Sequence, residues 1–237
     1  MLIPQNIHSS WKNFLNNGMI RLLSDIESKL GPNINPTRPD VILRFMTIDL
    51  DKVKVVWLGQ DVYPAEGVAT GRSFEVGGLT DWNSTFRQVS LKNIVRLIHK
   101  TYNDIHEYSD IKGFKEIQGF IKQGEFPILH PVEWFQSLEQ QGVLFLNTSF
   151  TCEVGKPNSH KALWTDFSEQ VLAYISIVRP DLVWFLWGKE AIANKQFLRS
   201  GVLKESRHPM MCSEKYEDDF LKSDCFKSTM SDINWLG

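Results

Sequence analysis

The chain has few cysteines, and their spacing excludes several kinds of site. Its 237 residues include only three cysteines, Cys152, Cys212 and Cys225, and no two of them form a C-x-x-C pair. Zinc ribbons, cysteine-rich deaminase sites and four-cysteine iron–sulfur clusters therefore lack a ligand set. A sparse and odd number of cysteines is also typical of proteins from a reducing compartment.

The sequence also lacks a large charge excess and a long apolar segment. The formal net charge of −2 argues against bulk electrostatic attraction to nucleic acid, although it allows a local basic face. No apolar run reaches membrane-spanning length, and the N-terminal segment "MLIPQNIHSSWKN" does not have the pattern of a secretory signal. We therefore expect an intracellular protein with no membrane partner, in the cytoplasm or nucleoid if bacterial and in the nucleus or a replication compartment if eukaryotic or viral.

What is present indicates one ordinary globular domain. Hydrophobic residues make up 42% of the chain and charged residues 23%, and eight tryptophans provide large side chains for burial. No internal repeat, low-complexity segment or linker divides the sequence. We predict a single domain over residues 1–237, with an N-terminal helical segment, residues 1–35, packed on it.

Apolar runs and helical patterns alternate along the chain. Helical spacing predicts a first helix over residues 9–30, with Ser9 or Ser10 as its N-cap, followed by an extended connector over residues 32–40. Apolar runs typical of buried parallel strands occur at 53–58, 142–147, 181–188 and, more weakly, 201–206. Further helices are expected at 85–101, 131–141, 161–178 and 189–199. This order predicts an α/β fold with three layers, in which helices cover both faces of a central, mostly parallel four-stranded sheet.

Polar side chains follow the predicted strands at the points where they end. The first strand is followed by Asp61, the second ends at Asn147, and the last runs into His208. Each of these residues alone is explained by a turn or a helix cap. Because ligands bind beyond the carboxyl ends of strands in open parallel sheets, the three together indicate one site at that edge.

Five motifs then carry a resemblance to a known family. The segments "GQDVYP", "GRSFEV", "VLFLNTSFTCEVGKPNSHKALW", "LVWFLWG" and "SRHPMMCS" occur in this order. They resemble the family 1 uracil-DNA glycosylases, whose corresponding motifs read GQDPYH, G-x-x-F-S-V, LNT with N-S-H-K, FLLWG and HPSPLS. The resemblance extends from about residue 36 to the C-terminus. It implies the uracil-DNA glycosylase fold, and a partner that is uracil-containing DNA, double- or single-stranded.

The resemblance also implies how a flipped base is recognised. The amide of Asn147 would pair with the N3–H and O4 of uracil and reject cytosine, whose groups have the opposite polarity. Tyr63 would exclude the methyl group of thymine, and Phe74 would stack on the base. Gln60 would lie beside them, where backbone N–H groups near Gln60 and Asp61 form a donor set. Ordinary core packing is the alternative explanation for both aromatic residues.

Two residues are expected to carry the chemistry. Asp61 would orient water and stabilise positive charge on the deoxyribose. His208 would donate a hydrogen bond to uracil O2 as negative charge develops there. One carboxylate could suffice, in contrast to the two of sugar hydrolases, because uracil leaves as a delocalised anion. The resemblance implies no metal, no organic cofactor and a protein that acts as a monomer.

The remaining motif positions imply contacts with DNA, and here the chain departs from the family. Ser90 is the residue retained from an expected proline-rich loop, and Ser159 and His160 come from the N-S-H-K motif. The family's duplex-opening leucine is replaced by Cys212, so we expect Met211 to act as the wedge, although local packing of the methionines is an equal alternative. The predicted DNA-contacting residues are Ser90, Ser159, His160, Met210, Met211, Cys212 and Ser213.

Three further departures lie around the base pocket. Val62 and Pro64 replace the family's proline and histidine on either side of Tyr63, and Glu75 replaces the serine after Phe74. These changes leave three hypotheses. The favoured one is an active uracil-DNA glycosylase. The second is a glycosylase of the same fold acting on another damaged base or on single strands, and the third is a non-catalytic DNA- or partner-binding protein.

Overall fold

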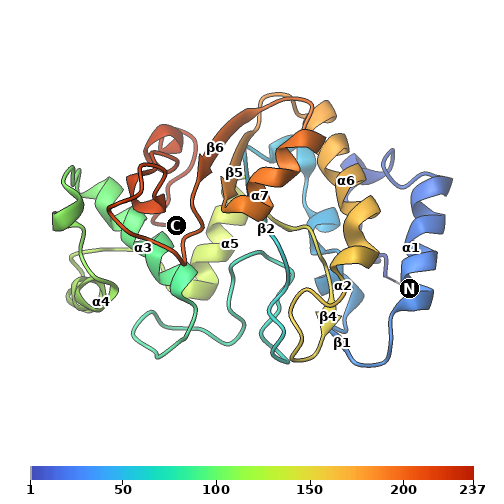
Figure 1. The fold of residues 1–237 in the computed structure, drawn as a ribbon, viewed down its shortest axis with the longest axis horizontal. Helices are drawn as coiled ribbons and strands as arrows, with labels where there is room; N and C mark the ends of the chain where they lie inside the picture. Colours follow the sequence, from blue (N-terminus) through green and yellow to red (C-terminus); the bar gives the residue numbers. More distant parts are fainter. Residues whose placement is uncertain (1) are drawn as a thin grey trace.

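Four apolar segments pair side by side as parallel strands in the computed structural model, which describes residues 2–237 (Figure 1). They are β2 (Val55–Gly59), β3 (Val143–Asn147), β5 (Val183–Trp187) and β6 (Val202–Ser206). Their order across the sheet is β3-β2-β5-β6, and every neighbouring pair is parallel. The central strand β2 is buried along its whole length because β3 and β5 flank it and helices cover both faces. The predicted three-layer α/β fold is confirmed.

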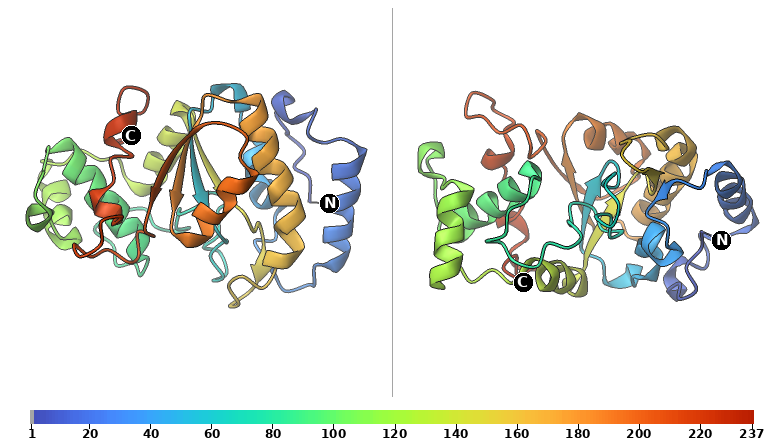
Figure 2. Two further views of the ribbon diagram at one scale, coloured as in Figure 1. Left: turned by 45° about the horizontal axis from the view of Figure 1, so that its top comes forward. Right: turned by 90° about the horizontal axis from the view of Figure 1, so that it is seen from below.

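Alternate residues of β2, β3 and β5 supply two separate cores, whereas the edge strand β6 is mostly exposed. On one face Trp57, Phe145 and Phe185 pack with the helices α3 (Val89–Tyr102), α4 (Phe114–Gln123) and α5 (Pro131–Gln141) and with the C-terminal segment. On the other face Val56, Leu144 and the rest of their row pack with α1 (Asn17–Lys29), α2 (Pro39–Ile42) and α6 (Lys161–Val178). Figure 2 shows helices on both sides of the strands, and the two termini lie on opposite sides of the sheet. Of the helices within residues 2–237, none has the length and apolar character needed to cross a bilayer.

The N-terminal helix begins later than the sequence pattern predicts. Residues Ser9–Trp11 form a short 3₁₀ turn, and α1 starts only at Asn17. Asn16 is the N-cap, because its side-chain oxygen accepts hydrogen bonds from the N–H groups of Gly18 at 2.9 Å and Met19 at 3.2 Å. The prediction of one helix from residue 9, capped by Ser9 or Ser10, was therefore wrong.

Two other predicted segments are subdivided. The connector at 32–40 contains β1 (Ile34–Asn35), which pairs antiparallel with β4 (Cys152–Glu153), and α2 begins at Pro39. The helix expected at 189–199 is α7 (Lys189–Ala193) followed by the 3₁₀ turn Asn194–Phe197. The β1–β4 pair matters for the site, because it brings residue 35 beside the loop that follows β2.

Candidate functional site

A cavity of about 380 Å³ lies at the carboxyl edge of the sheet and is lined in part by the segment that follows β2. Figure 1 shows the course of that long segment between β2 and α3. It brings together side chains from segments far apart in the sequence. All six predicted catalytic and base-binding residues line it, and so do two of the predicted DNA contacts: Gln60, Asp61, Tyr63, Phe74, Ser90, Asn147, His208 and Met210. The structure therefore brings these predicted residues together, and the role of each residue stays a prediction.

Asp61 presents one bonded and one unbonded carboxylate oxygen. Its Oδ2 accepts a short hydrogen bond from the backbone N–H of Asn158, which fixes the side chain. Its Oδ1 is buried and accepts no hydrogen bond from residues 2–237. Burial raises the pKa of Asp61, and the N–H of Asn158 opposes that effect only in part. When the carboxylate is ionised, a desolvated oxygen of this kind is a strong acceptor for water or a reacting group.

Asn147 reaches the cavity because the neighbouring strand leaves room for it. Gly59 lies opposite Asn147 in the register of β2 and β3. A Cβ atom on Gly59 would approach Asn147 Oδ1 to 2.3 Å, so only glycine fits there. Asn147 is 5% exposed, and its amide makes no side-chain hydrogen bond within the described residues. A buried amide with unused donors and acceptors is suited to a ligand that supplies both.

Tyr63 is held as a wall of the cavity from two directions. The buried amide of Asn35, on β1, donates to the carbonyl oxygens of Tyr63 at 2.6 Å and of Ala65 at 3.2 Å. The Tyr63 hydroxyl lies 3.5 Å from the carbonyl oxygen of Phe74. Burial raises the pKa of Tyr63 to about 12, so the ring remains neutral at physiological pH. The Tyr63 hydroxyl thus lies against the backbone of Phe74 at the cavity wall.

Phe74 lies in an unusual backbone conformation. Its φ of 64° is in the left-handed region, which a bulky side chain rarely adopts. The ring packs edge-on against Trp187, with ring centroids 5.5 Å apart, and against Trp57, at 6.2 Å. Phe74 is therefore seated on the aromatic core while also lining the cavity, so core packing and base stacking are compatible explanations for this residue.

His208 has a defined tautomer. Its Nδ1 accepts a hydrogen bond from the backbone N–H of Met210 at 3.2 Å, so in the neutral ring the proton is on Nε2. Burial lowers the pKa of His208, which keeps the ring neutral at physiological pH. Nε2 is then a hydrogen-bond donor on a side chain that lines the cavity beside Asn147 and Phe74.

Comparison with curated proteins identifies the relatives of this chain. A protein named uracil-DNA glycosylase from Francisella tularensis subsp. holarctica is 32% identical over 186 residues, which are 77% of this chain and 72% of the relative. The chain belongs to the uracil-DNA glycosylase family. Uracil-DNA glycosylase 1 of Listeria innocua is 33% identical over 167 residues, covering 70% of this chain and 63% of that protein. No protein-family profile matches the chain.

Solved structures of uracil-DNA glycosylases share the fold. The UNG of Nitratifractor salsuginis has a TM-score of 0.67 at 19% identity and covers 87% of this chain and 85% of its own. The mimivirus uracil-DNA glycosylase has a TM-score of 0.61 at 22% identity, over 88% of this chain and 70% of its own. At these identities the likeness concerns the fold alone.

The predicted DNA contacts of this uracil-DNA glycosylase fall into different environments. Ser90 lines the cavity from the first turn of α3. Ser159 is exposed, and its hydroxyl accepts from the N–H of Glu153 at 2.7 Å. His160 is 6% exposed and lies 2.9 Å from the hydroxyl of Thr151, which argues against the predicted contact with DNA. We interpret His160 as a buried structural residue at the start of α6.

The segment after His208 is anchored at both ends. Asn93 on α3 donates to the carbonyl of Pro209 at 2.6 Å, and the N–H of Ser213 donates to Asp219 at 2.6 Å. Between these anchors Met210 is 56% exposed and Met211 is 60% exposed. Cys212 is half-buried, and its thiol donates to the carbonyl of Pro209 at 3.3 Å. Burial raises the pKa of this thiol to about 12, so it stays protonated.

Two residues of the site were missed by the sequence reasoning. Asn158 supplies the N–H that holds Asp61, and its side-chain oxygen accepts from Gln60 Nε2 at 2.9 Å. It stands in the recognised N-S-H-K motif, directly before the two residues that were chosen as DNA contacts. Asn35, which fixes the backbone around Tyr63, had no signal except its place before a proline.

Proposed function

We propose that this protein excises uracil from DNA by hydrolysing the N-glycosidic bond, leaving an abasic site. One observation carries the proposal: the Asp61 carboxylate, the unbonded Asn147 amide and the Nε2–H of His208 line one cavity in a member of the uracil-DNA glycosylase family. The tyrosine and phenylalanine that bound the cavity suit a flat ring taken out of a duplex. A non-catalytic protein would have no need of this combination.

Base recognition follows from the polarity of the amide. Uracil presents an N3–H donor beside the O4 acceptor, and the oxygen and nitrogen of the Asn147 amide can pair with both. Cytosine presents an acceptor and a donor at these positions, so two like groups would face each other without a hydrogen bond. The side chain of Tyr63 excludes the additional methyl group of thymine by its volume, and Phe74 replaces the stacking that the base loses on leaving the duplex.

Bond cleavage uses a carboxylate and a neutral imidazole. The bond between C1′ and N1 breaks, and its electron pair moves onto the uracil ring. His208 Nε2–H stabilises the resulting charge on O2 by a hydrogen bond. Ionised Asp61 stabilises the positive sugar, orients a water molecule through its Oδ1 and takes the proton as the water oxygen bonds to C1′. The proposal requires no metal or organic cofactor and no second copy of the chain, so we expect a monomer to be active.

The exposed methionines are the best candidates for holding a duplex open. Met211 is 60% exposed between two anchored residues and does not line the cavity. Cys212 is turned inward by its hydrogen bond to Pro209. We therefore propose Met211 as the wedge and Met210 as part of the cavity mouth.

Base release from oligonucleotides tests the proposed function. The purified protein is incubated with single and double strands that contain uracil, thymine, hypoxanthine or xanthine, and the released base and alkali-labile sites are measured. Release of uracil with no release of thymine is expected. Release of only another base would favour the hypothesis of a shifted substrate, and release of none from either strand state would exclude glycosylase activity. Tyr63→Ala is included because it should open the cavity to thymine.

A further inference from the structure

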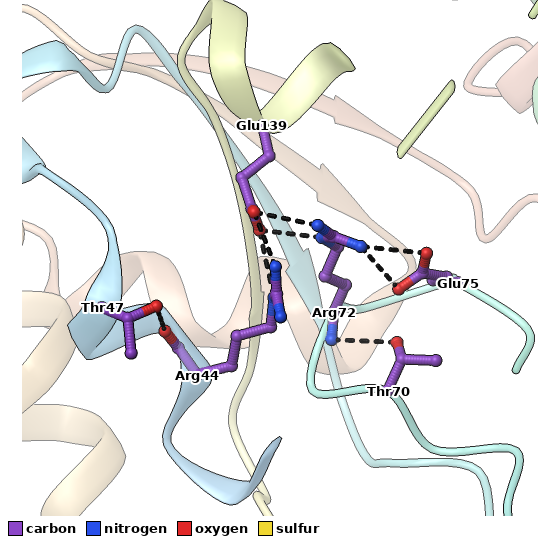
Figure 3. Close-up of polar contacts among 6 residues, drawn as sticks. All are labelled: Arg44, Thr47, Thr70, Arg72, Glu75 and Glu139. Carbon is purple, nitrogen blue, oxygen red and sulfur yellow. Dashed lines mark hydrogen bonds and ion pairs between the residues drawn. The ribbon is translucent and has the colours of Figure 1, made fainter. Parts of the chain in front are cut away.

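A buried arginine on the Phe74 loop is bound by two carboxylates. The guanidinium of Arg72 donates from Nε and Nη2 to Glu139 on α5, at 2.8 and 2.9 Å, in a bidentate pair. Its Nη1 donates to both oxygens of Glu75 at 3.0 Å. Figure 3 shows Arg72 between the two carboxylates, with Glu75 on the same loop and Glu139 on a helix from the other side. These hydrogen bonds join the loop that contains Phe74 to helix α5.

A second arginine balances the charges of this cluster. Arg44 donates to the same Glu139 carboxylate at 2.8 and 3.3 Å, so two arginines meet two glutamates (Figure 3). The side chains of Arg72, Glu75 and Glu139 are 10%, 8% and 13% exposed. Burial would raise the pKa of Glu139, but the hydrogen bonds and charges of the two arginines outweigh it and lower that pKa. The lowered pKa keeps Glu139 ionised between the two arginines, and Glu75 pairs with Arg72.

The backbone of the loop is fixed on each side of Phe74. Gly71 has a φ of 86°, and a Cβ there would lie 2.3 Å from the carbonyl oxygen of Val41, so the loop lies directly on the α2 segment. The hydroxyl of buried Ser73 donates to the carbonyl of Trp57 at 3.0 Å. Arg72 and Glu75 then flank Phe74 and bond to each other. A strained backbone such as that of Phe74 persists only where its surroundings over-determine it.

We propose that Arg72, clamped by Glu75 and Glu139, is a positioning residue that holds Phe74 in its left-handed conformation so that its ring can stack on the flipped base. This inference rests on the proposed function and extends it to residues outside the base contacts. Arg72 also lines the cavity, where an arginine could bind phosphate directly. Its Nε and both terminal nitrogens already donate to carboxylates, which favours the positioning role.

The test uses one single and one double variant. Arg72→Met leaves Glu75 and Glu139 short of a positive partner and can destabilise the protein. Arg72→Met/Glu75→Met removes one charge of each sign and leaves Arg44 paired with Glu139, so the fold should retain its stability while the clamp is lost. Phe74→Ala is the reference for lost stacking. Arg179→Met is the matched control, because Arg179 is 15% exposed in its own ion pair with Asp181, at the end of α6 away from the cavity.

Three quantities are measured on each variant: the inhibition constant of free uracil, the affinity for a duplex with an abasic site, and hydrogen exchange of the amides of residues 71–75. Because stacking on an aromatic ring contributes roughly 1–3 kcal/mol per base, the double variant should bind uracil about fivefold or more weakly, as Phe74→Ala does. Its amides 71–75 should exchange faster, and its affinity for the abasic duplex should stay within about twofold of the wild type. The control should change none of the three.

Two results would overturn the inference. The first is unchanged uracil affinity and unchanged exchange in the folded double variant. The second is weaker abasic-duplex binding with a smaller salt dependence, which would make Arg72 a phosphate ligand. Hydrogen exchange at residues 71–75 reports on the clamp even if the wild type released no uracil, so failure of the proposed function and failure of the clamp are distinguishable.

Discussion

At the residue scale, the two residues expected to carry the chemistry each have one hydrogen-bonding atom occupied by a neighbour and one left available to a ligand. Asp61 keeps Oδ1 unbonded because Asn158 binds Oδ2, and His208 keeps the proton on Nε2 because Met210 occupies Nδ1. The cavity-lining residues that were predicted each stand at the end of a strand or in a recognisable motif. Two of their hydrogen-bond partners, Asn158 and Asn35, were not predicted, because they approach from segments distant in the sequence and bond partly to or from the backbone.

The polarity of the Asn147 amide gives a prediction of base choice. In Asn147→Asp a carboxylate replaces the amide, so it can accept from the N4 amine of cytosine but repels O4 of uracil. We expect the uracil rate to fall by about tenfold or more and cytosine release to become detectable. The released bases are separated and quantified from cytosine- and uracil-containing strands. Asn103→Asp, at the end of α3, is the control, and a variant that still ignores cytosine would contradict the assigned role.

The pKa directions of Asp61 and His208 predict the pH dependence. The active form has ionised Asp61 and neutral His208, so each group must lose a proton as pH rises. Burial raises the first pKa above its ordinary 3.8 and lowers the second below its ordinary 6.5. We therefore expect kcat/KM to rise with pH as both groups lose their protons, with the Asp61 midpoint above 3.8 and the His208 midpoint below 6.5, and then to stay level. Loss of activity across the neutral range would mean that a charged His208 is the donor.

At the element scale, helix boundaries were the least predictable feature. Apolar spacing continued through residues 9–30, but α1 is capped at Asn16, whose side chain accepts from two backbone N–H groups, and this cap divides the segment. The sequence reasoning did not identify α4, although Gly113 precedes it and Gly124 adopts the left-handed C-cap conformation after it. Short helices of this kind are stabilised mainly by tertiary packing, here of Ile117 in the core, which local sequence does not reveal.

The anchored segment after His208 carries a prediction about strand preference. Met211→Ala removes the exposed side chain proposed as the wedge, so uracil release from duplex DNA should fall by about tenfold or more, whereas the single-strand rate should hardly change. Rates on both substrates are compared at limiting DNA concentration. Cys212→Ala should mainly lower thermal stability, and Met230→Ala, which is exposed elsewhere, is the control. An equal loss on both substrates would remove Met211 from duplex opening.

At the scale of the whole molecule, the sheet defines the position of the site. Four apolar runs predicted a parallel sheet, because residues buried on both faces leave an unbroken hydrophobic pattern. Strand order did not follow from the pattern. In the observed order β3-β2-β5-β6, Gly59 lies opposite Asn147, and residues at or beyond the ends of β2, β3 and β6 meet at one cavity. The Arg72 cluster likewise joins residues 44, 72, 75 and 139, a combination that only the folded chain brings together.

We propose above all that the Asp61 carboxylate is the catalytic group that orients water for hydrolysis of the bond between uracil and deoxyribose. The most direct measurement is the single-turnover rate of uracil release from a uracil-containing single strand, by the wild type and by Asp61→Asn, with a chelator present. We predict release by the wild type and a loss of about a hundredfold or more in the variant, which should still bind the strand. No release by the wild type from single or double strands, or an unchanged rate in Asp61→Asn, would contradict the claim.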